Sequence, residues 1–208
     1  SDPIDPSRIN IKSGPVRLHE GGAGPRSHAM PVNTDYETFE GMLSEDLIAE
    51  VAEFVSKLFS SPDGPKVDPK RYATRLRSNL IGCPWVFSGI ARRDGRVVGL
   101  KLGCSHDPRS FDSYMGGVSP TARRQGVAEE LARRQEVWCR AQGFQFITTE
   151  TEYDNRAMMS LNLKRGFYVA GTVTARRAKL KVLMEKDLRE PQETSEETPQ
   201  TVDCVPSR

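Results

Sequence analysis

The chain has few cysteines, few aromatic residues and no long apolar segment. Its four cysteines, in 208 residues, are scattered, with no C-x-x-C pair and no matching histidine spacing: Cys83, Cys104, Cys139 and Cys204. This spacing argues against a zinc site and predicts the reduced thiols of a cytoplasmic protein. No segment approaches the roughly 20 apolar residues of a membrane span, and no signal peptide is recognisable at the start. We therefore expect no metal, no membrane contact and a cytoplasmic location.

The chain has no large excess of positive or of negative charge. Thirty lysines and arginines oppose 28 acidic residues, which gives a formal net charge of +2. This balance excludes a strongly basic protein that wraps nucleic acid, and it excludes an acidic, solvating chain. No nucleic-acid partner is expected.

The composition divides the chain into three parts. Residues 1–30 are rich in proline and glycine and show no periodic apolar pattern, which predicts an irregular arm. Residues 31–187 carry the patterns of one folded domain, and residues 188–208 predict an acidic, solvated tail. If the two ends of the chain are ordered, they need contacts that stabilise them, and a second subunit of a homodimer is one candidate for these contacts.

Apolar periodicity between these ends predicts a regular series of elements. Helices are expected at residues 44–60, 68–80, 126–142 and 155–165, and strands at 85–92, 97–104, 111–118, 144–149, 167–173 and 180–184. The third helix is expected to bury Val127, Leu131 and Val137. Asp94-Gly95 is a strong hairpin signal. An antiparallel start followed by strand–helix alternation predicts the α/β (α+β) class, with a mixed, mostly antiparallel sheet flanked by helices.

The most informative segment is residues 115–128, where a strand ends, a short loop follows and a helix begins at a glycine. The first amides of a helix have no internal partner and lie at the positive end of its dipole, so a pyrophosphate can bind there. Gly126 and Ala128 leave the backbone open to a phosphate, and Arg123 and Arg124 add positive charge. On this segment alone, the alternative is an ordinary strand-to-helix turn with a solvated arginine pair.

Two motifs together resemble those of a known family. The first resembles the acyl-CoA pyrophosphate motif of the GNAT superfamily of N-acyltransferases: Arg123-x-x-Gly126-x-Ala128. The second resembles the family segment that lines the thiol end of CoA: Asn155-x-x-Met158-x-x-Leu161-Asn162-x-x-x-Gly166-Phe167. The expected elements follow the order of the family fold over about residues 43–187, and the two motifs in this order are far more specific than either alone.

This resemblance implies transfer of an acetyl group from acetyl-CoA to a primary amine, which attacks the thioester directly without a metal or an acyl-enzyme. The strand ending at Val118 would splay from the strand that follows residue 144, and pantetheine would lie in the V. A backbone N–H near Val118 would polarise the thioester carbonyl. The implied CoA-binding residues are Gly117, Val118, Arg123, Arg124, Gln125, Gly126, Val127, Ala128, Asn155 and Asn162.

The glycines of this segment support two expectations. Gly116 and Gly117 fit a place where a ligand approaches the backbone closely, or else they mark a β-bulge. Replacing Gly126 with valine is expected to displace the pyrophosphate at only a modest cost to folding, because helix propensity changes little.

The expected catalytic groups are Glu150, Asn162 and Tyr114. Many family members carry a tyrosine as general acid beside the sulfur, where this chain has Asn162, which donates a hydrogen bond but no proton. Tyr114 is a substitute by residue type. The acceptor amine must lose a proton before it attacks. Glu150, at the end of the strand opposite Val118, is the first candidate base, Glu152 is another, and Asp112 and His106 lie further off. The alternative is that Glu150 and Glu152 are solvated charges at a strand end.

Two other functions fit the same motifs. One is a catalytically silent module that binds acyl-CoA, which the missing tyrosine suggests. The other is an acetyltransferase that acts on protein lysines or N-termini. The first two helices and the loop between them, residues 59–68, are expected to select the acceptor. Release of CoA with a panel of amines would separate an enzyme from a silent binder.

Overall fold

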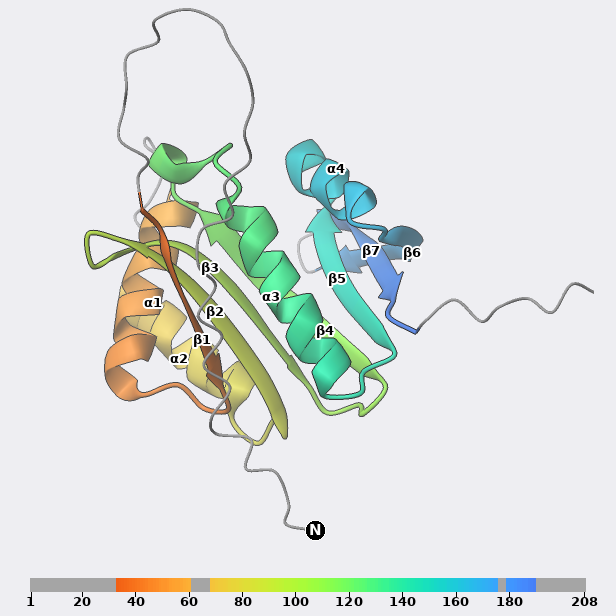
Figure 1. The fold of residues 1–208 in the computed structure, drawn as a ribbon, viewed down its shortest axis with the longest axis horizontal. Helices are drawn as coiled ribbons and strands as arrows, with labels where there is room; N and C mark the ends of the chain where they lie inside the picture. The colour runs from red at the N-terminus through yellow and green to blue at the C-terminus, as the bar shows by residue number, and fades with distance from the viewer. Residues whose placement is uncertain (1–32, 61–67, 176–178, 190–208) are drawn as a thin grey trace, which may run out of the picture. The chain divides into compact units, whose positions relative to one another are not determined.

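Seven strands of the described residues form one sheet, in the order β1-β2-β3-β4-β5-β7-β6 (Figure 1). The structure is a computed structural model and describes residues 33–60, 68–175 and 179–189. The strands are β1 (Asp35–Glu40), β2 (Trp85–Arg93), β3 (Arg96–Ser105), β4 (Ser110–Val118), β5 (Phe146–Glu152), β6 (Tyr168–Ala175) and β7 (Lys179–Asp187). Only β4 and β5 pair in parallel, so the expected mixed, mostly antiparallel sheet is confirmed.

In the described part of the chain, four α-helices pack on this sheet: α1 (Glu45–Phe59), α2 (Pro69–Leu80), α3 (Val127–Ala141) and α4 (Arg156–Lys164). Side chains cap three of them, because Ser44, Asp68 and Asn155 each accept a hydrogen bond from a backbone N–H of the first turn. The helix α3 begins after Gly126 without such a cap. The four helices predicted from the sequence are confirmed to within about two residues at each end.

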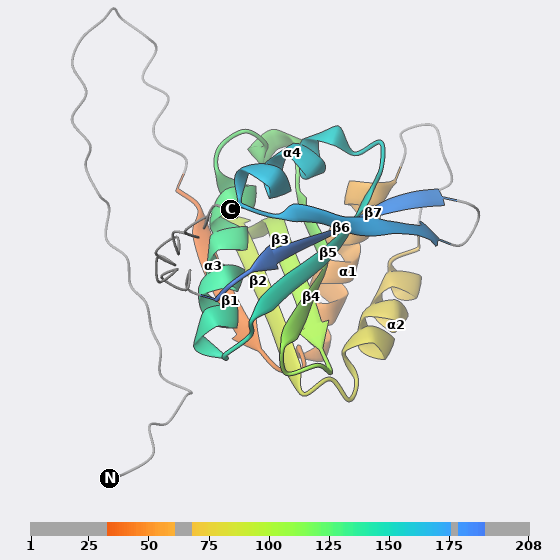
Figure 2. The same cartoon turned by 90° about the vertical axis from the view of Figure 1, so that its right-hand side faces the viewer.

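The helices cover the two faces of the sheet (Figures 1 and 2). On one face, α1 and α2 pack on β2 and β3 through an apolar cluster that includes Ile48, Val51 and Leu100. On the other face, α3 packs through a cluster that includes Phe111 and Trp138, and α4 lies beside it. Because both faces of the central strands are covered, a charged side chain in the middle of β3 or β4 is held close to apolar neighbours.

The strands β4 and β5 diverge along their length. They pair only from Ser110 opposite Phe146 to Asp112 opposite Thr148. One step further, the Thr149 hydroxyl donates to the Ser113 carbonyl at 2.8 Å, and no pairing follows within the described residues. The chain therefore has the V-shaped splay that the family resemblance implies.

Two details differ from the prediction, besides the bounds of β5 and β7, which were expected at 144–149 and 180–184. The sequence analysis missed β1, which pairs antiparallel with β2, because it is a six-residue edge strand with a weak alternation beside the glycine-rich arm. Val137 is 46% exposed and does not belong to the buried face of α3. At about 100° per residue it lies about 80° from Val127 and about 120° from Leu131 around the helix, and Trp138 takes the buried position between those two.

Several predictions fall on residues outside the described ranges. These are the arm over residues 1–30, the break at 61–65, Cys204 and nearly all of the acidic tail, so the three-part division of the chain stays a prediction. Cys83, Cys104 and Cys139 are free thiols. Within the described ranges, no helix is both long and apolar enough to cross a membrane, and no cluster of His, Cys, Asp and Glu could hold a metal ion.

Candidate active site

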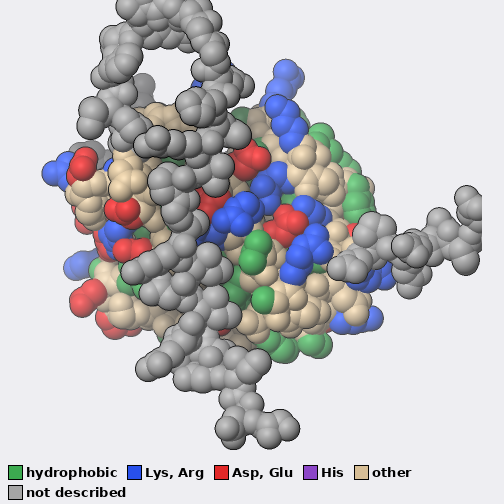
Figure 3. Space-filling model, in the orientation of Figure 1, with side chains coloured by type: hydrophobic (Ala, Val, Ile, Leu, Met, Phe, Trp, Pro, Cys, Tyr) green, Lys and Arg blue, Asp and Glu red, His purple; other side chains and the backbone are tan. Residues whose placement is uncertain are grey.

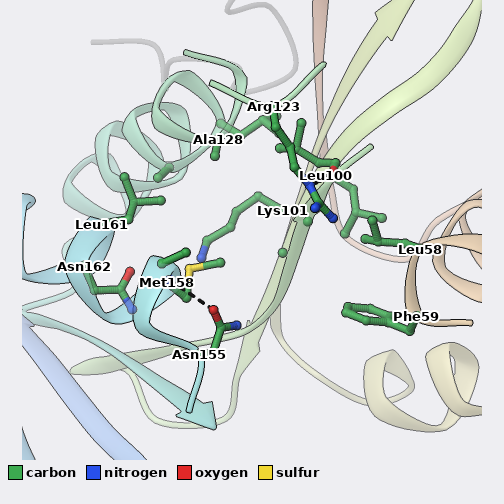
Figure 4. Close-up of a pocket in the computed structure, with 16 residues that line it drawn as sticks. Leu58, Phe59, Leu100, Lys101, Arg123, Ala128, Asn155, Met158, Leu161 and Asn162 are labelled. Atoms are coloured by element: carbon green, nitrogen blue, oxygen red, sulfur yellow. Dashed lines mark hydrogen bonds between the residues drawn. The ribbon is translucent and has the colours of Figure 1, made fainter. Parts of the chain in front are cut away.

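A cavity of about 420 Å³ lies where β4 and β5 diverge, and its walls come from both faces of the sheet (Figure 4). The end of α1 supplies Leu58 and Phe59 on one side, while α3 and α4 form the other side. The sheet contributes Leu100, Lys101 and residues 116–118 between them. The splay therefore leaves a passage in which groups on opposite faces of the sheet can meet.

Gly116 and Gly117, near the end of β4, line this cavity without side chains of their own. A Cβ added at Gly117 would lie 2.2 Å from Leu58 Cδ2, and one at Gly116 would lie 3.2 Å from Lys101 Cδ. Both glycines pair in regular register with β3, and the register shift falls at Ser113 and Tyr114 instead. The β-bulge alternative for the glycines is therefore wrong, and each glycine makes room for a side chain of the cavity lining, Leu58 at Gly117 and Lys101 at Gly116.

The loop from β4 to α3 has the backbone shape of an anion site. Arg124 and Gly126 adopt left-handed conformations, with φ of 60° and 78°. Alternating left-handed residues turn successive N–H groups toward one concave side, and the uncapped first turn of α3 adds further amides. Arg123 donates from Nε to the Val118 carbonyl at 3.2 Å, which holds its guanidinium at the end of β4.

Two asparagines of the second motif line the cavity from α4. Asn155 caps the helix, because its Oδ1 accepts a hydrogen bond from the Met158 N–H at 3.2 Å (Figure 4). Asn162 is buried, and its Nδ2 donates to the sulfur of Met184 at 3.6 Å. The backbone carbonyl of Asn162 accepts hydrogen bonds from the backbone N–H groups of Arg165 and Phe167, at the end of the helix. Both asparagines thus have structural contacts as well as a place at the cavity.

Comparison with known proteins agrees with this geometry. The model of the acetyltransferase (GNAT) family matches residues 48–167, which is more than half of the chain. The chain belongs to the GNAT family of acetyltransferases. It is 28% identical over 114 residues, 51% of this chain and 74% of the relative, to the aminoglycoside N(6')-acetyltransferase type 1 of Klebsiella aerogenes.

Solved GNAT structures share the fold at low sequence identity. Ard1 from Thermoplasma volcanium superposes with a TM-score of 0.57 at 17% identity, over 74% of this chain and 99% of that one. The acetyltransferase yncA from Salmonella typhimurium, solved with its cofactor acetyl-CoA, gives a TM-score of 0.54 at 17% identity over 75% and 96% of the two chains. The family and its fold, expected from the two motifs, are confirmed, and acetyl-CoA is the family's acyl donor.

The GNAT cavity brings together six of the ten residues expected to bind CoA: Gly117, Val118, Arg123, Ala128, Asn155 and Asn162. Arg124, Gln125 and Gly126 are exposed on the loop beside it. Val127 points the other way, since a Cβ added at Gly99 of β3 would lie 2.8 Å from its Cγ1. Its side chain therefore packs α3 on the sheet, and only its backbone belongs to the loop.

The expected base lies on the sheet face opposite α4. Thr149 and Met184 pair across β5 and β7 on the α4 side, so the adjacent Glu150 points to the other face. Glu150 forms a 2.7 Å ion pair with Lys181 and is not part of the cavity lining. Asp112 lies on the same face. Surrounding protein atoms and the charge of Glu150 raise the pKa of Asp112 to about 6.

Tyr114 is set apart from the cavity. The extra residue of β4 at the register shift turns its ring into the cluster beneath α1 and α2. Burial raises the pKa of its phenol, and its hydroxyl has no hydrogen-bond partner in the described part of the chain. The tyrosine that the sequence offered as a substitute acid is therefore a core residue in this structure.

Lys101 is the charged cavity residue that the sequence analysis missed. It comes from the middle of β3, between the buried Leu100 and Leu102, and its side chain extends into the cavity (Figure 4). The available signal was a lysine inside an otherwise apolar strand, Arg96–Ser105. In a strand covered on both faces, a charged residue is uncommon unless it has a partner or a function.

The cavity wall formed by α3 and α4 is held by a cluster of charges. Glu136 of α3 accepts hydrogen bonds from Arg165 at the end of α4 (2.9 Å), from Lys186 of β7 (2.7 Å) and from Arg140 (3.3 Å). Burial alone would raise the pKa of Glu136, but Lys186, Arg140 and Arg165 hold it below its usual range. Figure 3 shows acidic and basic side chains interleaved over this part of the surface.

Replacing Glu136 with glutamine is expected to reduce the free energy of unfolding by about 2 kcal/mol, because Arg165 and Lys186 would be left half-buried without a carboxylate. Urea denaturation at pH 7 measures the loss. The matched control is Glu130→Gln, a glutamate of the same helix whose partners Arg133 and Arg134 are more exposed, with an expected loss below about 1 kcal/mol. Equal losses in the two variants would contradict a special role for Glu136.

The contribution of Glu136 also has a defined pH dependence. Its pKa is lower in the folded chain than the ordinary value of 4.5, so the stabilisation is fully present above about pH 5 and is lost as the carboxylate takes up a proton at lower pH. The difference between parent and Glu136→Gln should therefore shrink as the pH falls below 4.5.

Proposed function

We propose that this GNAT enzyme transfers an acetyl group from acetyl-CoA to the nitrogen of a primary amine, in one step within a ternary complex. The observation that carries the proposal is the cavity through the splay, with uncapped helix amides at one mouth and carboxylates on the opposite sheet face. Acetyl-CoA bound on the α4 side would place its thioester in the splay, where an acceptor amine could reach it from the other side.

The half of the site that would bind acetyl-CoA is assigned to the end of β4, the loop after it and the start of α3. The amides of residues 124–128 would bind the pyrophosphate, and Arg123 and Arg124 would add positive charge. The bare backbone of Gly117 and Val118 would pair with pantetheine like an added strand. One of these amides would donate to the thioester oxygen, where negative charge develops as the amine attacks.

The acceptor half is assigned to the face that carries Glu150. Its carboxylate would take the proton that the acceptor ammonium must lose before attack. The similarity to an aminoglycoside acetyltransferase supports an amine as acceptor. A long groove on this face would favour a peptide acceptor, and a closed pocket would favour a metabolite, so a panel of small amines and peptides is the direct test of the acceptor class.

Acetyl-CoA is expected to stabilise the fold, because its pyrophosphate would bind the native loop and not the unfolded chain. At 100 times its dissociation constant the gain is about 2.7 kcal/mol, or a rise in Tm of roughly 5–10 °C for a chain of this size. Thermal unfolding with and without acetyl-CoA measures it, and acetate is the control. No shift at millimolar acetyl-CoA would contradict the proposal, and binding without CoA release toward any amine would favour the silent module.

Asn162→Ala is expected to lower kcat by about fivefold. Asn162 would give the departing thiolate one neutral hydrogen bond, worth on the order of 1 kcal/mol. Because its amide also bonds Met184, the variant needs a thermal-unfolding measurement beside the kinetics. A loss of several thousandfold with folding and acetyl-CoA binding intact would mean that Asn162 orients the acceptor instead.

A further inference from the structure

Lys101 is the one cavity residue of the described chain that can give up a proton near neutral pH. The arginine of the lining, Arg123, stays charged at any accessible pH, and the amides of Asn155 and Asn162 do not ionise. Tyr114, which the sequence suggested as a substitute acid, lies instead in the cluster beneath α1 and α2. Breaking the thioester releases a thiolate, so a proton donor in the cavity has a clear use.

The position of Lys101 fits that use. It pairs across the strands with Gly116, on the face that α4 covers, and Figure 4 shows its side chain extending from β3 toward the α4 side of the cavity. Met158 and Asn162 line that side. Because Gly116 lacks a side chain, nothing from β4 separates the lysine from a ligand that follows this strand.

The ammonium group of Lys101 also has no partner of its own. No hydrogen bond or ion pair joins it to any residue in the ranges that the structure describes, although apolar side chains such as Met158 and Leu161 line much of the cavity. An unpaired cation in such a place is unfavourable unless a negative group joins it at some stage. Resting on the proposed function, we infer that Lys101 protonates the sulfur of CoA as the acetyl group leaves.

The step balances in atoms and electrons. The nitrogen of the acceptor bonds to the carbonyl carbon, and the electron pair of the carbon–sulfur bond moves to sulfur. An ammonium proton of Lys101 passes to sulfur, so that CoA leaves as the thiol and Lys101 becomes a neutral amine. The acceptor ammonium loses one proton to Glu150 before it attacks, and its nitrogen loses a second proton to water after the new bond has formed. Glu150 passes its proton to water and Lys101 regains one from water, so one proton is released per turnover.

The surroundings of Lys101 suit this exchange. Burial and the charge of Arg165, at the end of α4, lower its pKa to about 8, against the opposing charge of Asp112 on β4. The guanidinium of Arg123 lines the same cavity. An ordinary thiol has a pKa of about 8.5, so transfer between lysine and sulfur is nearly balanced. Lys101 is then mostly charged at pH 7 and loses its proton above about pH 8.

Two substitutions test the inference. Lys101→Met removes the proton and the charge, and Lys101→Arg keeps the charge but cannot release a proton. Both are expected to lower kcat by about 100-fold, with the dissociation constant of acetyl-CoA changed less than about threefold. The parent should lose kcat above about pH 8, and both variants should lack that decline. Lys164→Met, an exposed lysine of α4 outside the cavity, is the matched control with parental kinetics.

A second measurement does not depend on turnover. The thiol of bound CoA, titrated by its thiolate absorbance, should ionise at lower pH in the parent and in Lys101→Arg than in Lys101→Met, because a nearby cation favours the thiolate. Unchanged kcat in Lys101→Met, or a thiol titration that does not differ from the parent, would overturn the inference. So would a loss confined to acetyl-CoA affinity that arginine restores, since Lys101 would then hold the CoA phosphates.

The result separates this inference from the proposed function. If the parent fails to bind acetyl-CoA or to release CoA with any amine, the proposed function is wrong. If the parent binds and turns over while Lys101→Met behaves like it, only the role of Lys101 is wrong. Circular dichroism of both variants checks the fold. The fold should be retained because neither substitution breaks a hydrogen bond or an ion pair of Lys101.

Discussion

Glu150→Gln is expected to lower kcat by about 100-fold or more, with the dissociation constant of acetyl-CoA unchanged. The reason is that glutamine keeps the size of the side chain but cannot take the proton of the acceptor ammonium, a step for which general bases typically contribute 100-fold to 10,000-fold. Glu150 points away from α4, so it is not expected to touch the CoA half of the site. Initial rates at saturating acetyl-CoA and equilibrium binding separate the two quantities.

The matched control is Glu152→Gln, two residues further along the same face of β5. It should keep kcat within about threefold of the parent. If Glu150→Gln does the same, Glu150 is not the base. In that case Asp112→Asn is the next variant, because Asp112 lies on the same face and has a pKa raised to about 6.

Gly126→Ala is expected to weaken acetyl-CoA binding at least tenfold, while Gly143→Ala leaves it unchanged. Both glycines flank α3, both have a left-handed φ, of 78° and 83°, and a Cβ at either meets no atom within 4 Å. Each substitution should therefore cost folding a similar amount, about 1 kcal/mol. Only Gly126 lies in the loop where a phosphate would approach the backbone, so only its methyl group would obstruct the ligand.

The measurements are acetyl-CoA affinity by calorimetry and stability by urea denaturation. If Gly126→Ala binds acetyl-CoA like the parent, the assignment of the pyrophosphate to this loop is wrong. The left-handed φ also corrects the expectation that valine at Gly126 costs folding little. A β-branched side chain is strained in that conformation, so alanine paired with Gly143→Ala is the cleaner test.

Local signals predicted most of the elements correctly. Ser44, Asp68 and Asn155 cap their helices through bonds that span at most three residues, and Asp94-Gly95 makes its hairpin with φ of 48° and 74°. Such contacts involve only neighbouring residues, so the sequence is enough to find them. The same holds for the loop at Gly126, whose motif, together with that of α4, indicated the family before the fold was known.

Which face of the sheet a given side chain occupies was decided only by the tertiary structure. The extra residue at Ser113 and Tyr114 turns the tyrosine into the core, and no local pattern marks it, because it arises from the pairing of β4 with β3. Lys101 looks from the sequence like a stray charge in an apolar strand. Only the pairing with Gly116, the divergence of β4 from β5 and the packing of α4 bring it to the cavity. Those contacts join residues far apart in the chain, and their register is fixed by the burial of whole faces instead of by any neighbouring residue.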